Sequence, residues 1–259
     1  MALKDITLGQ YFPGNTLLHR LDPRTKLLFT VAYIVALFLA KQVVSYAILF
    51  VLLAVLIGHL LWFAGIHGAA IVSGMLQMFW LTNLGMNQQA LAQGAPLPHI
   101  FMEAFWTFFI VVGGSGATMG LVFCYLRSRS AHLRSIGRLS VVPSLFNINE
   151  PVIFGTPIVM NPVFFIPFLL APMVNAVLAW AAMKLDLIGR VISVVWTAPA
   201  PIGGAWALGW DFRAAILVIV LACVSAIIYF PFFKVYEKQL LAQEAEEAER
   251  AERESQQTA

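Results

Sequence analysis

Residues 141–162 read VVPSLFNINEPVIFGTPIVMNP, and this stretch decides the fold because it is apolar and yet repeatedly interrupted. It contains four prolines, three asparagines and one carboxylate, that of Glu150. Irregular backbone at membrane depth is tolerated only where protein buries it or where it lines a cavity. The stretch is therefore predicted to be a re-entrant hairpin that faces an internal site. A surface loop is the alternative, although this stretch is too apolar for an ordinary loop.

Residues 193–211, SVVWTAPAPIGGAWALGWD, have the same character, with two closely spaced prolines ahead of a glycine pair. They predict a second re-entrant hairpin. The apolar runs at 163–183 and 213–233 are long enough to cross a bilayer core of about 30 Å as full helices.

The composition of the whole chain agrees with a membrane setting. Of its 259 residues, 60% are hydrophobic and only 11% are charged, whereas soluble domains carry about 25% charged residues. The prediction is an all-α integral membrane protein with about six transmembrane helices and two re-entrant hairpins. No basic stripe with interleaved aromatic residues occurs, which argues against a nucleic-acid partner.

The N-terminal half supplies the other predicted crossings. Residues 1–26 are polar and lack the apolar core of a cleavable signal peptide. A break between crossings is expected near Gly58–His59, and a polar loop at 84–98. The predicted crossings are 27–40, 43–57, 61–82 and 100–126.

Charge gives the expected orientation. Residues 127–138, RSRSAHLRSIGR, hold four arginines and no acid, so the positive-inside rule makes this segment cytoplasmic, together with Arg20–Lys26. Four crossings between the two basic segments return the chain to the same side. Residues 236–259 carry 3 basic and 7 acidic side chains and are predicted to be a charged cytoplasmic helical tail. A solvated helix face and a partner-binding segment are both open readings of that tail.

Glu150 is the most informative residue, because it is the only acid between Glu103 and Asp186. Acids inside a membrane protein tend to mark substrate or ion pathways. Asn147 and Asn149 flank it, and their amides can donate to a carboxylate or to hydroxyls. The cluster suits a polyhydroxylated ligand. A carboxylate that pins the hairpin is the alternative, and both roles can hold together.

His67 lies in WFAGIHGAA between Gly65 and Gly68, which permit close approach of a backbone or a ligand. It is a candidate partner for a sugar hydroxyl and can also move a proton; a satisfied interhelical donor is the alternative. The aromatic faces of Trp62 and Trp196 suit the C–H faces of sugar rings, although tryptophan is equally ordinary at a membrane interface.

Other chemistry finds little support in the sequence. Cys124 and Cys223 each lie in an apolar run, which indicates buried thiols. HExxH, CxxC and GxSxG motifs are absent, and GGSGATMG at 113–120 lacks the Lys–Ser/Thr of a phosphate-binding loop, so its glycines are expected to serve helix packing. We therefore expect neither a metal site nor a cofactor.

From about residue 61 to 236 the sequence resembles the EIIC membrane component of bacterial phosphoenolpyruvate-dependent sugar phosphotransferase systems, of the lactose/cellobiose/diacetylchitobiose type. The resemblance is carried by LLWFAGIHGAAIV, GGSGATMGLVF, RSRSAHLRSIGRLSVVPSLFNINEPVIFGTPIVMNPVFFIPF and VVWTAPAPIGG. It implies a permease of the bacterial inner membrane that binds a disaccharide and carries it inward. A cytoplasmic EIIB partner, which works with EIIA-type proteins, would then phosphorylate the sugar from its phosphocysteine.

The same resemblance implies roles for individual residues. Glu150 and His67 fall on the glutamate and histidine that hydrogen-bond the sugar near its 6-hydroxyl, which makes them the expected catalytic pair. The remaining expected substrate contacts are Trp62, Asn147, Asn149 and Trp196, the asparagines by shaping the hairpin tip.

Residues 1–57 resemble something else. DITLGQYFPGNTLLHRLDPRTKLLFTVAYIVALFLA is similar to the start of the T component of an energy-coupling-factor vitamin transporter, with LDPRTKLL its clearest part. The chain is thus expected to have three parts, at 1–57, 58–235 and 236–259. Because the front half of an EIIC supplies the dimer interface and further sugar contacts, a homodimer or a second chain is expected to complete it. A vitamin-transporter scaffold and an inactive fusion fragment are the alternative functions.

Overall fold

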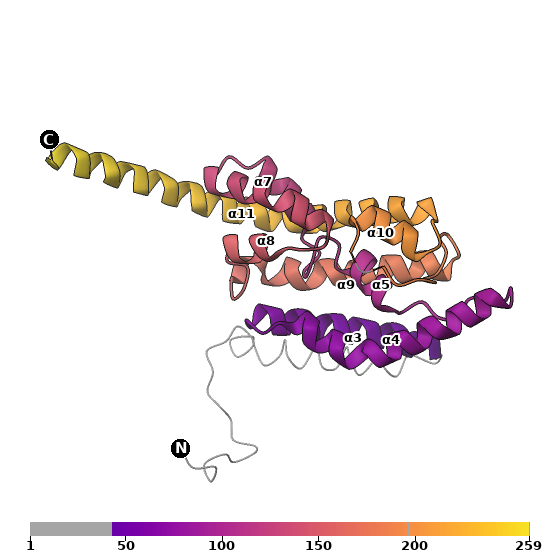
Figure 1. Cartoon of the computed structure of the whole chain (residues 1–259). Helices are drawn as coiled ribbons and strands as arrows, with labels where there is room; N and C mark the ends of the chain where they lie inside the picture. The colour runs from indigo at the N-terminus through magenta and orange to yellow at the C-terminus, as the bar shows by residue number, and fades with distance from the viewer. Residues whose placement is uncertain (1–42, 196, 259) are drawn as a thin grey trace, which may run out of the picture. The chain divides into compact units, whose positions relative to one another are not determined.

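The structure is a computed structural model that describes residues 43–195 and 197–258. Residues Ile48–Ala259 form one compact unit. Every regular element within the described residues is a helix, which confirms the all-α prediction (Figure 1). Three described helices are long and apolar enough to cross a membrane, and Ile48–Phe63 is a shorter apolar helical stretch. The three are Gly68–Ala92, Pro162–Lys184 and the apolar part of Phe212–Glu246.

Helices α3 (Val43–Phe63) and α4 (Gly68–Ala92) are joined by a four-residue turn. The break expected near Gly58–His59 is wrong, because α3 runs through it without interruption. The buried His59 imidazole donates through Nδ1 to the Val55 carbonyl at 2.7 Å, one turn back in the same helix, while its Nε2 has no hydrogen-bond partner among the described residues. The turn falls instead at 64–67, where Gly65 takes a φ of 84°.

The polar loop expected at 84–98 is also wrong in its first half, since α4 continues to Ala92. Asparagines in this stretch find partners without leaving the helix. The buried Asn83 donates to the Phe101 carbonyl at 3.1 Å, and Asn87 donates to the Val191 carbonyl at 2.9 Å. Tertiary hydrogen bonds therefore override the loop-like composition.

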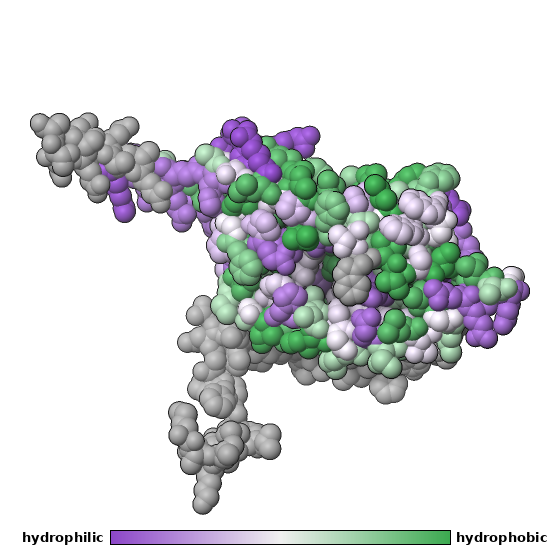
Figure 2. All heavy atoms as spheres, in the orientation of Figure 1, coloured by the Kyte–Doolittle hydropathy of each residue, from purple (hydrophilic) through white to green (hydrophobic). Residues whose placement is uncertain are grey.

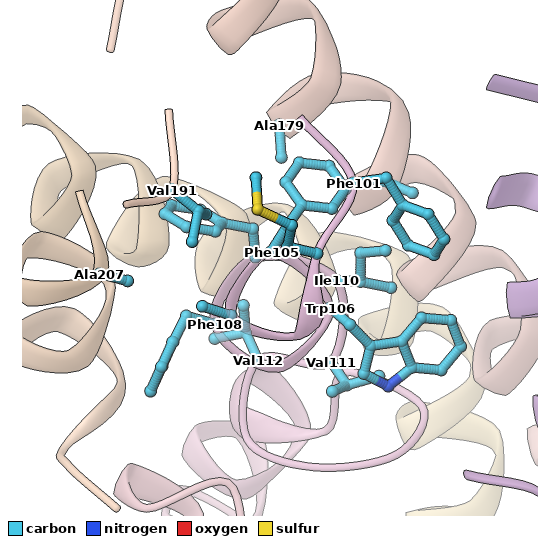
Figure 3. Close-up of a cluster of buried hydrophobic side chains, with 14 of the residues drawn as sticks. Phe101, Phe105, Trp106, Phe108, Ile110, Val111, Val112, Ala179, Val191 and Ala207 are labelled. Carbon is cyan, nitrogen blue, oxygen red and sulfur yellow. The ribbon is translucent and has the colours of Figure 1, made fainter. Parts of the chain in front are cut away.

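The next apolar segment, predicted as a single crossing at 100–126 with glycines for helix packing, is instead a broken helix. It comprises α5 (Glu103–Phe105), the π-helix η2 (Trp106–Ile110), a loop at 111–118 and α6 (Met119–Leu126). Large side chains of η2 fill the centre of the main hydrophobic core, as Figure 3 shows for Trp106, Phe108 and Ile110. The loop's glycines at 113, 114 and 116 all have positive φ, between 82° and 98°.

Residues 131–155 form a helical hairpin of α7 (Ala131–Leu145) and α8 (Glu150–Gly155). At its base the His132 imidazole lies 3.2 Å from the Gly155 carbonyl oxygen, so α8 returns alongside α7. A hairpin is present in this region, but it spans 131–155 and not 141–162, because its first arm begins at Ala131 and Pro162 already starts the next helix. Most of the arginine-rich segment 127–138 is therefore helix and not loop.

The C-terminal part contains α9 (Pro162–Lys184), α10 (Ala200–Ala207) and α11 (Phe212–Thr258). The residues between α9 and α10 form no helix, and α10 packs its glycine pair against η2 and α11, with Gly203 on the Phe108 ring. The expected helix at 213–233 is part of α11, which packs along α6 and α9. It then continues through the whole described tail.

The start of the tail is fastened to the base of the hairpin. Glu237, which is 4% exposed, accepts hydrogen bonds from the Ser128 hydroxyl and the Arg129 N–H, both at 2.7 Å. Two turns further, Glu244 accepts from the Ser130 hydroxyl at 2.6 Å. Hydrophilic residues gather over this end of the molecule and along the projecting part of α11 (Figure 2). The first turns of the tail are thus bonded to the chain and are not simply a solvated face.

Close packing of α6 on α11 gives a test of the fold. A Cβ added at Gly120 would lie 2.7 Å from the Ala222 carbonyl oxygen and still closer to the Ala226 backbone. We expect Gly120→Ala to cost about 1–3 kcal/mol and to lower the unfolding temperature in detergent. Gly74→Ala is the matched control, because nothing lies within 4 Å of the added Cβ. Equal unfolding temperatures for the two variants would contradict this packing.

Candidate functional site

Two asparagines at the hairpin tip hold the broken helix. Asn147 accepts a hydrogen bond from the Gly113 N–H at 2.7 Å and donates to the Thr107 carbonyl at 3.0 Å. Asn149, only 4% exposed, donates to the Ser115 carbonyl at 2.6 Å and to the Thr118 hydroxyl at 2.9 Å. The tip of the hairpin and the loop at 111–118 are therefore bonded into one structure.

The local sequence explains why the chain turns here. Asn147 has a φ of 60°, a left-handed conformation that asparagine tolerates better than most residues. Pro151 lies in the first turn of α8, where its missing N–H costs no helical hydrogen bond. Opposite the tip, a Cβ on Gly114 would collide with the Asn149 side chain. The motif NINEP and the glycine loop are thus in close contact, and Gly114 leaves room for the Asn149 side chain.

Glu150 begins α8 directly after the tip and is exposed on the surface of this chain. Among the described residues its carboxylate has no hydrogen bond or ion pair. The alternative in which this carboxylate pins the hairpin is not what the structure contains, since the neighbouring asparagine amides do that. A carboxylate in the first turn of a helix is favoured by the helix dipole, and Glu150 remains free to accept hydrogen bonds from a ligand.

His67 caps the start of α4. Its Nδ1 accepts a hydrogen bond from the Ala70 N–H at 3.1 Å. Because Nδ1 is the acceptor, the neutral ring carries its proton on Nε2, which makes Nε2–H a donor. The side chain is exposed, and that donor is available to a ligand.

Trp62 lies against His67, with the ring centroids 4.4 Å apart and the planes tilted by 47°. It is 7% exposed, and its indole N–H has no partner within the described part of the chain. The ring packs in the same core cluster as Val152 and Ile153 of α8 and Ala117 of the glycine loop. Trp62, the glycine loop and the hairpin therefore pack in the same hydrophobic core cluster.

The predicted site residues are only partly brought together. Phe63, next to Trp62, accepts a hydrogen bond from the Met160 N–H at 3.1 Å, which links this turn to the segment after α8. No hydrogen bond joins His67 to Glu150 in the described structure. Trp196 lies outside the described residues.

Sequence reasoning missed the partnership between the asparagines and the glycine loop. The asparagines were expected to contact substrate, and each of their side chains is instead already bonded to the protein, which supports a shaping role. A signal for this was present: the glycine loop predicts a break in an apolar helix, and the exposed backbone groups of a break need partners. Two amides within three residues can supply them.

Discontinuous helices typically form the midplane substrate sites of secondary transporters, and here such a helix is bonded to the hairpin tip that precedes Glu150. The profile of the family described as "Phosphotransferase system, EIIC" matches residues 26–172, more than half of the chain. The chain belongs to this family. The matched range begins inside the segment 1–57 that resembles a vitamin-transporter T component.

Named relatives agree with this assignment. The lichenan permease IIC component of Bacillus subtilis (strain 168) is 40% identical over 196 residues, covering 74% of this chain and 43% of the relative. The cellobiose-specific EIIC component of Geobacillus stearothermophilus is 41% identical over 198 residues, covering 74% and 44%. The crystal structure of the transporter ChbC, the IIC component of an N,N'-diacetylchitobiose-specific system, matches with a TM-score of 0.74 and 35% identity, covering 85% of this chain and 56% of ChbC. The chain thus spans about half the length of these relatives.

The conformation of the tip can be tested at Asn147. Both Asn147→Gly and Asn147→Ala remove the two side-chain hydrogen bonds, but only alanine is strained at a φ of 60°. We expect alanine to be less stable than glycine by about 1–2 kcal/mol, measured as the difference in thermal unfolding in detergent. Equal stability of the two variants would mean that the tip does not adopt the left-handed turn.

Proposed function

We propose that the chain is the substrate-handling part of a phosphotransferase-system EIIC permease. It binds a disaccharide or related oligosaccharide of the cellobiose, lactose and diacetylchitobiose class and carries it across the bacterial inner membrane. The observation that carries this proposal is the hairpin tip bonded to the broken helix, which presents the unpartnered carboxylate of Glu150. The substrates named for the relatives support the sugar class.

In this proposal Glu150 and His67 act on the same sugar hydroxyl. The carboxylate accepts the hydroxyl hydrogen bond and serves as general base, while His67 donates from Nε2–H to the hydroxyl oxygen. That oxygen attacks the phosphorus of the EIIB phosphocysteine. The new O–P bond forms as the S–P bond breaks, the partner's cysteine leaves as a thiolate, and the hydroxyl proton passes to Glu150.

The other expected residues surround the ligand. Trp62 offers its unpartnered indole N–H as well as part of a ring face, because His67 covers one side of it. Trp196 is proposed to line the site from the segment before α10. Asn147 and Asn149 are proposed to act through the shape of the tip.

The length of the relatives bears on the partners. The matched part of this chain corresponds to 44% of the cellobiose permease, and we propose that the chain works as a homodimer or together with a second chain. EIIB and EIIA proteins are the proposed cytoplasmic partners; the lactose-specific relative of Streptococcus mutans is named an EIICB component. The leader, the basic segment 127–138 and the tail 236–259 are proposed to face the cytoplasm, with 58–235 as the translocation domain.

Sugar binding by the full chain tests the proposal. We expect calorimetry in detergent to detect cellobiose, lactose or diacetylchitobiose, and Glu150→Gln to weaken binding about 10- to 100-fold, the range for a hydrogen bond to a charged group. Glu103→Gln is the control, since that carboxylate is bonded to Gln77 of α4 at 3.3 Å and should not affect affinity. Wild-type protein that binds none of these sugars, or unchanged affinity in Glu150→Gln, would sink the proposal.

His67 allows its structural and ligand roles to be separated. Asparagine is among the best residues for capping a helix N-terminus, so His67→Asn should keep the unfolding temperature of the wild type while losing the Nε2–H donor. His67→Ala should lose both the cap and the donor. We expect both variants to weaken sugar binding at least fivefold in calorimetry, with only alanine lowering thermal stability. Full affinity in His67→Asn would remove this residue from the site.

A second candidate function follows from LDPRTKLL in the leader. A T-component-like scaffold would couple ATPases to a vitamin-binding partner. It predicts copurification with ATPase subunits and indifference to Glu150→Gln. The third candidate, an inactive fusion fragment, predicts neither sugar binding nor ATPase subunits in the same purification.

A further inference from the structure

Ser115 stands apart from its neighbours in the glycine loop. Between Val111 and Val122, Ser115 alone is partly accessible, and all the remaining residues are buried. Its hydroxyl makes no hydrogen bond within the described part of the chain, although its carbonyl is bonded to Asn149. A polar side chain in this position has donor and acceptor capacity that the protein itself does not use.

The loop around Ser115 is fixed from several sides. The Thr118 hydroxyl donates to the Gly113 carbonyl at 2.9 Å, and the Tyr229 hydroxyl of α11 donates to the Gly116 carbonyl at 2.7 Å. A Cβ at Gly116 would collide with the Phe168 ring. Because the backbone on both sides is held, Ser115 has a defined position and pays little ordering entropy on binding a ligand.

Ser115 is also tied to the carboxylate of the proposed site. The Asn149 amide that binds its carbonyl at 2.6 Å belongs to the residue immediately before Glu150. Asn149 is buried, whereas Ser115 and Glu150 on either side of it are accessible. The two accessible residues are therefore linked through one buried residue, Asn149, by a hydrogen bond on one side and a peptide bond on the other.

We propose that Ser115 is a further ligand-contact residue, whose hydroxyl binds a second hydroxyl of the disaccharide held by Glu150, and that Asn149 is a positioning residue that sets Ser115 relative to Glu150. The inference rests on the proposed sugar-binding function. A carboxylate only accepts hydrogen bonds, whereas a serine hydroxyl also donates. The pair can therefore recognise two neighbouring hydroxyls, which favours a polyhydroxylated ligand over a simple cation.

The contact is tested by calorimetry on the full chain with the parent disaccharide and its monodeoxy analogues. We expect Ser115→Ala to weaken binding of the parent sugar about fivefold, the usual size of one neutral hydrogen bond. One deoxy analogue should bind wild type and Ser115→Ala equally, because it lacks the hydroxyl in question. Ser135→Ala, at an exposed serine of α7, is the matched control and should bind like wild type. A fivefold loss retained with every analogue would overturn the contact.

Positioning by Asn149 is tested by combining variants. If Asn149 acts through Ser115, the double variant Asn149→Ala/Ser115→Ala should bind no more weakly than Asn149→Ala alone. A purely structural role would make the two losses multiply, which would overturn the positioning claim. Unfolding temperatures of all variants show whether each is folded.

Accessibility gives a readout that does not need affinity differences. In a Cys124→Ala/Cys223→Ala background, Ser115→Cys should react with a water-soluble thiol reagent, and saturating sugar should slow that reaction at least fivefold. Failure to react, or reaction unaffected by sugar, would overturn the inference. If Glu150→Gln weakens binding and Ser115→Ala does not, this inference alone fails; if neither does, the proposed function fails as well.

Discussion

The buried amide of Asn149 is the contact on which the rest of the site depends. It bridges the tip of the hairpin to the carbonyl of Ser115 and the hydroxyl of Thr118. A helix broken by three positive-φ glycines leaves backbone groups without helical partners, and in an apolar interior such groups are costly. Asn149 satisfies the Ser115 carbonyl, and Asn147, Thr118 and Tyr229 satisfy other groups of the same loop. The positions of the glycine loop, the hairpin tip and the Glu150 carboxylate are thus linked by the hydrogen bonds between the tip and the loop.

Around these hydrogen bonds, the residues that hold the backbone differ from those that have groups free to bind a ligand. Residues that hold the backbone, Asn147 and Asn149, are engaged by the protein, while Glu150 and the Nε2–H of His67 carry unused hydrogen-bonding capacity. The same logic applies to Trp62, which is buried as packing but keeps an unpartnered N–H. Side chains are preorganised when neighbours hold them in place before a ligand arrives. The described half of the site has that property.

Much of this fold could be predicted from the sequence, because lipid as a solvent permits few alternatives. The hairpin around NINEP and the helices after it follow from apolar runs and their interruptions, whereas the crossing expected at 100–126 proved to be a broken helix. Hydrogen-bond partners that lie far apart in the sequence could not be predicted. A break was expected near Gly58–His59, yet α3 is continuous there and the His59 side chain bonds to Val55 within the helix. The polar residues from position 84 onward suggested a loop, yet Asn87 among them lies in α4 and bonds to the distant Val191 carbonyl. A single sequence reveals which polar groups need partners but not which partners they find.

The hairpin is fastened at both ends, and this limits how the protein can work. Its tip is tied to the glycine loop by two asparagines, and its base is tied to α11 through Glu237 and Glu244. A movement of α7 and α8 away from the glycine loop and α11 would break all of these hydrogen bonds. In the proposed transport cycle, a movement of Glu150 that keeps these bonds would therefore carry α6, α7, α8 and α11 together as one body.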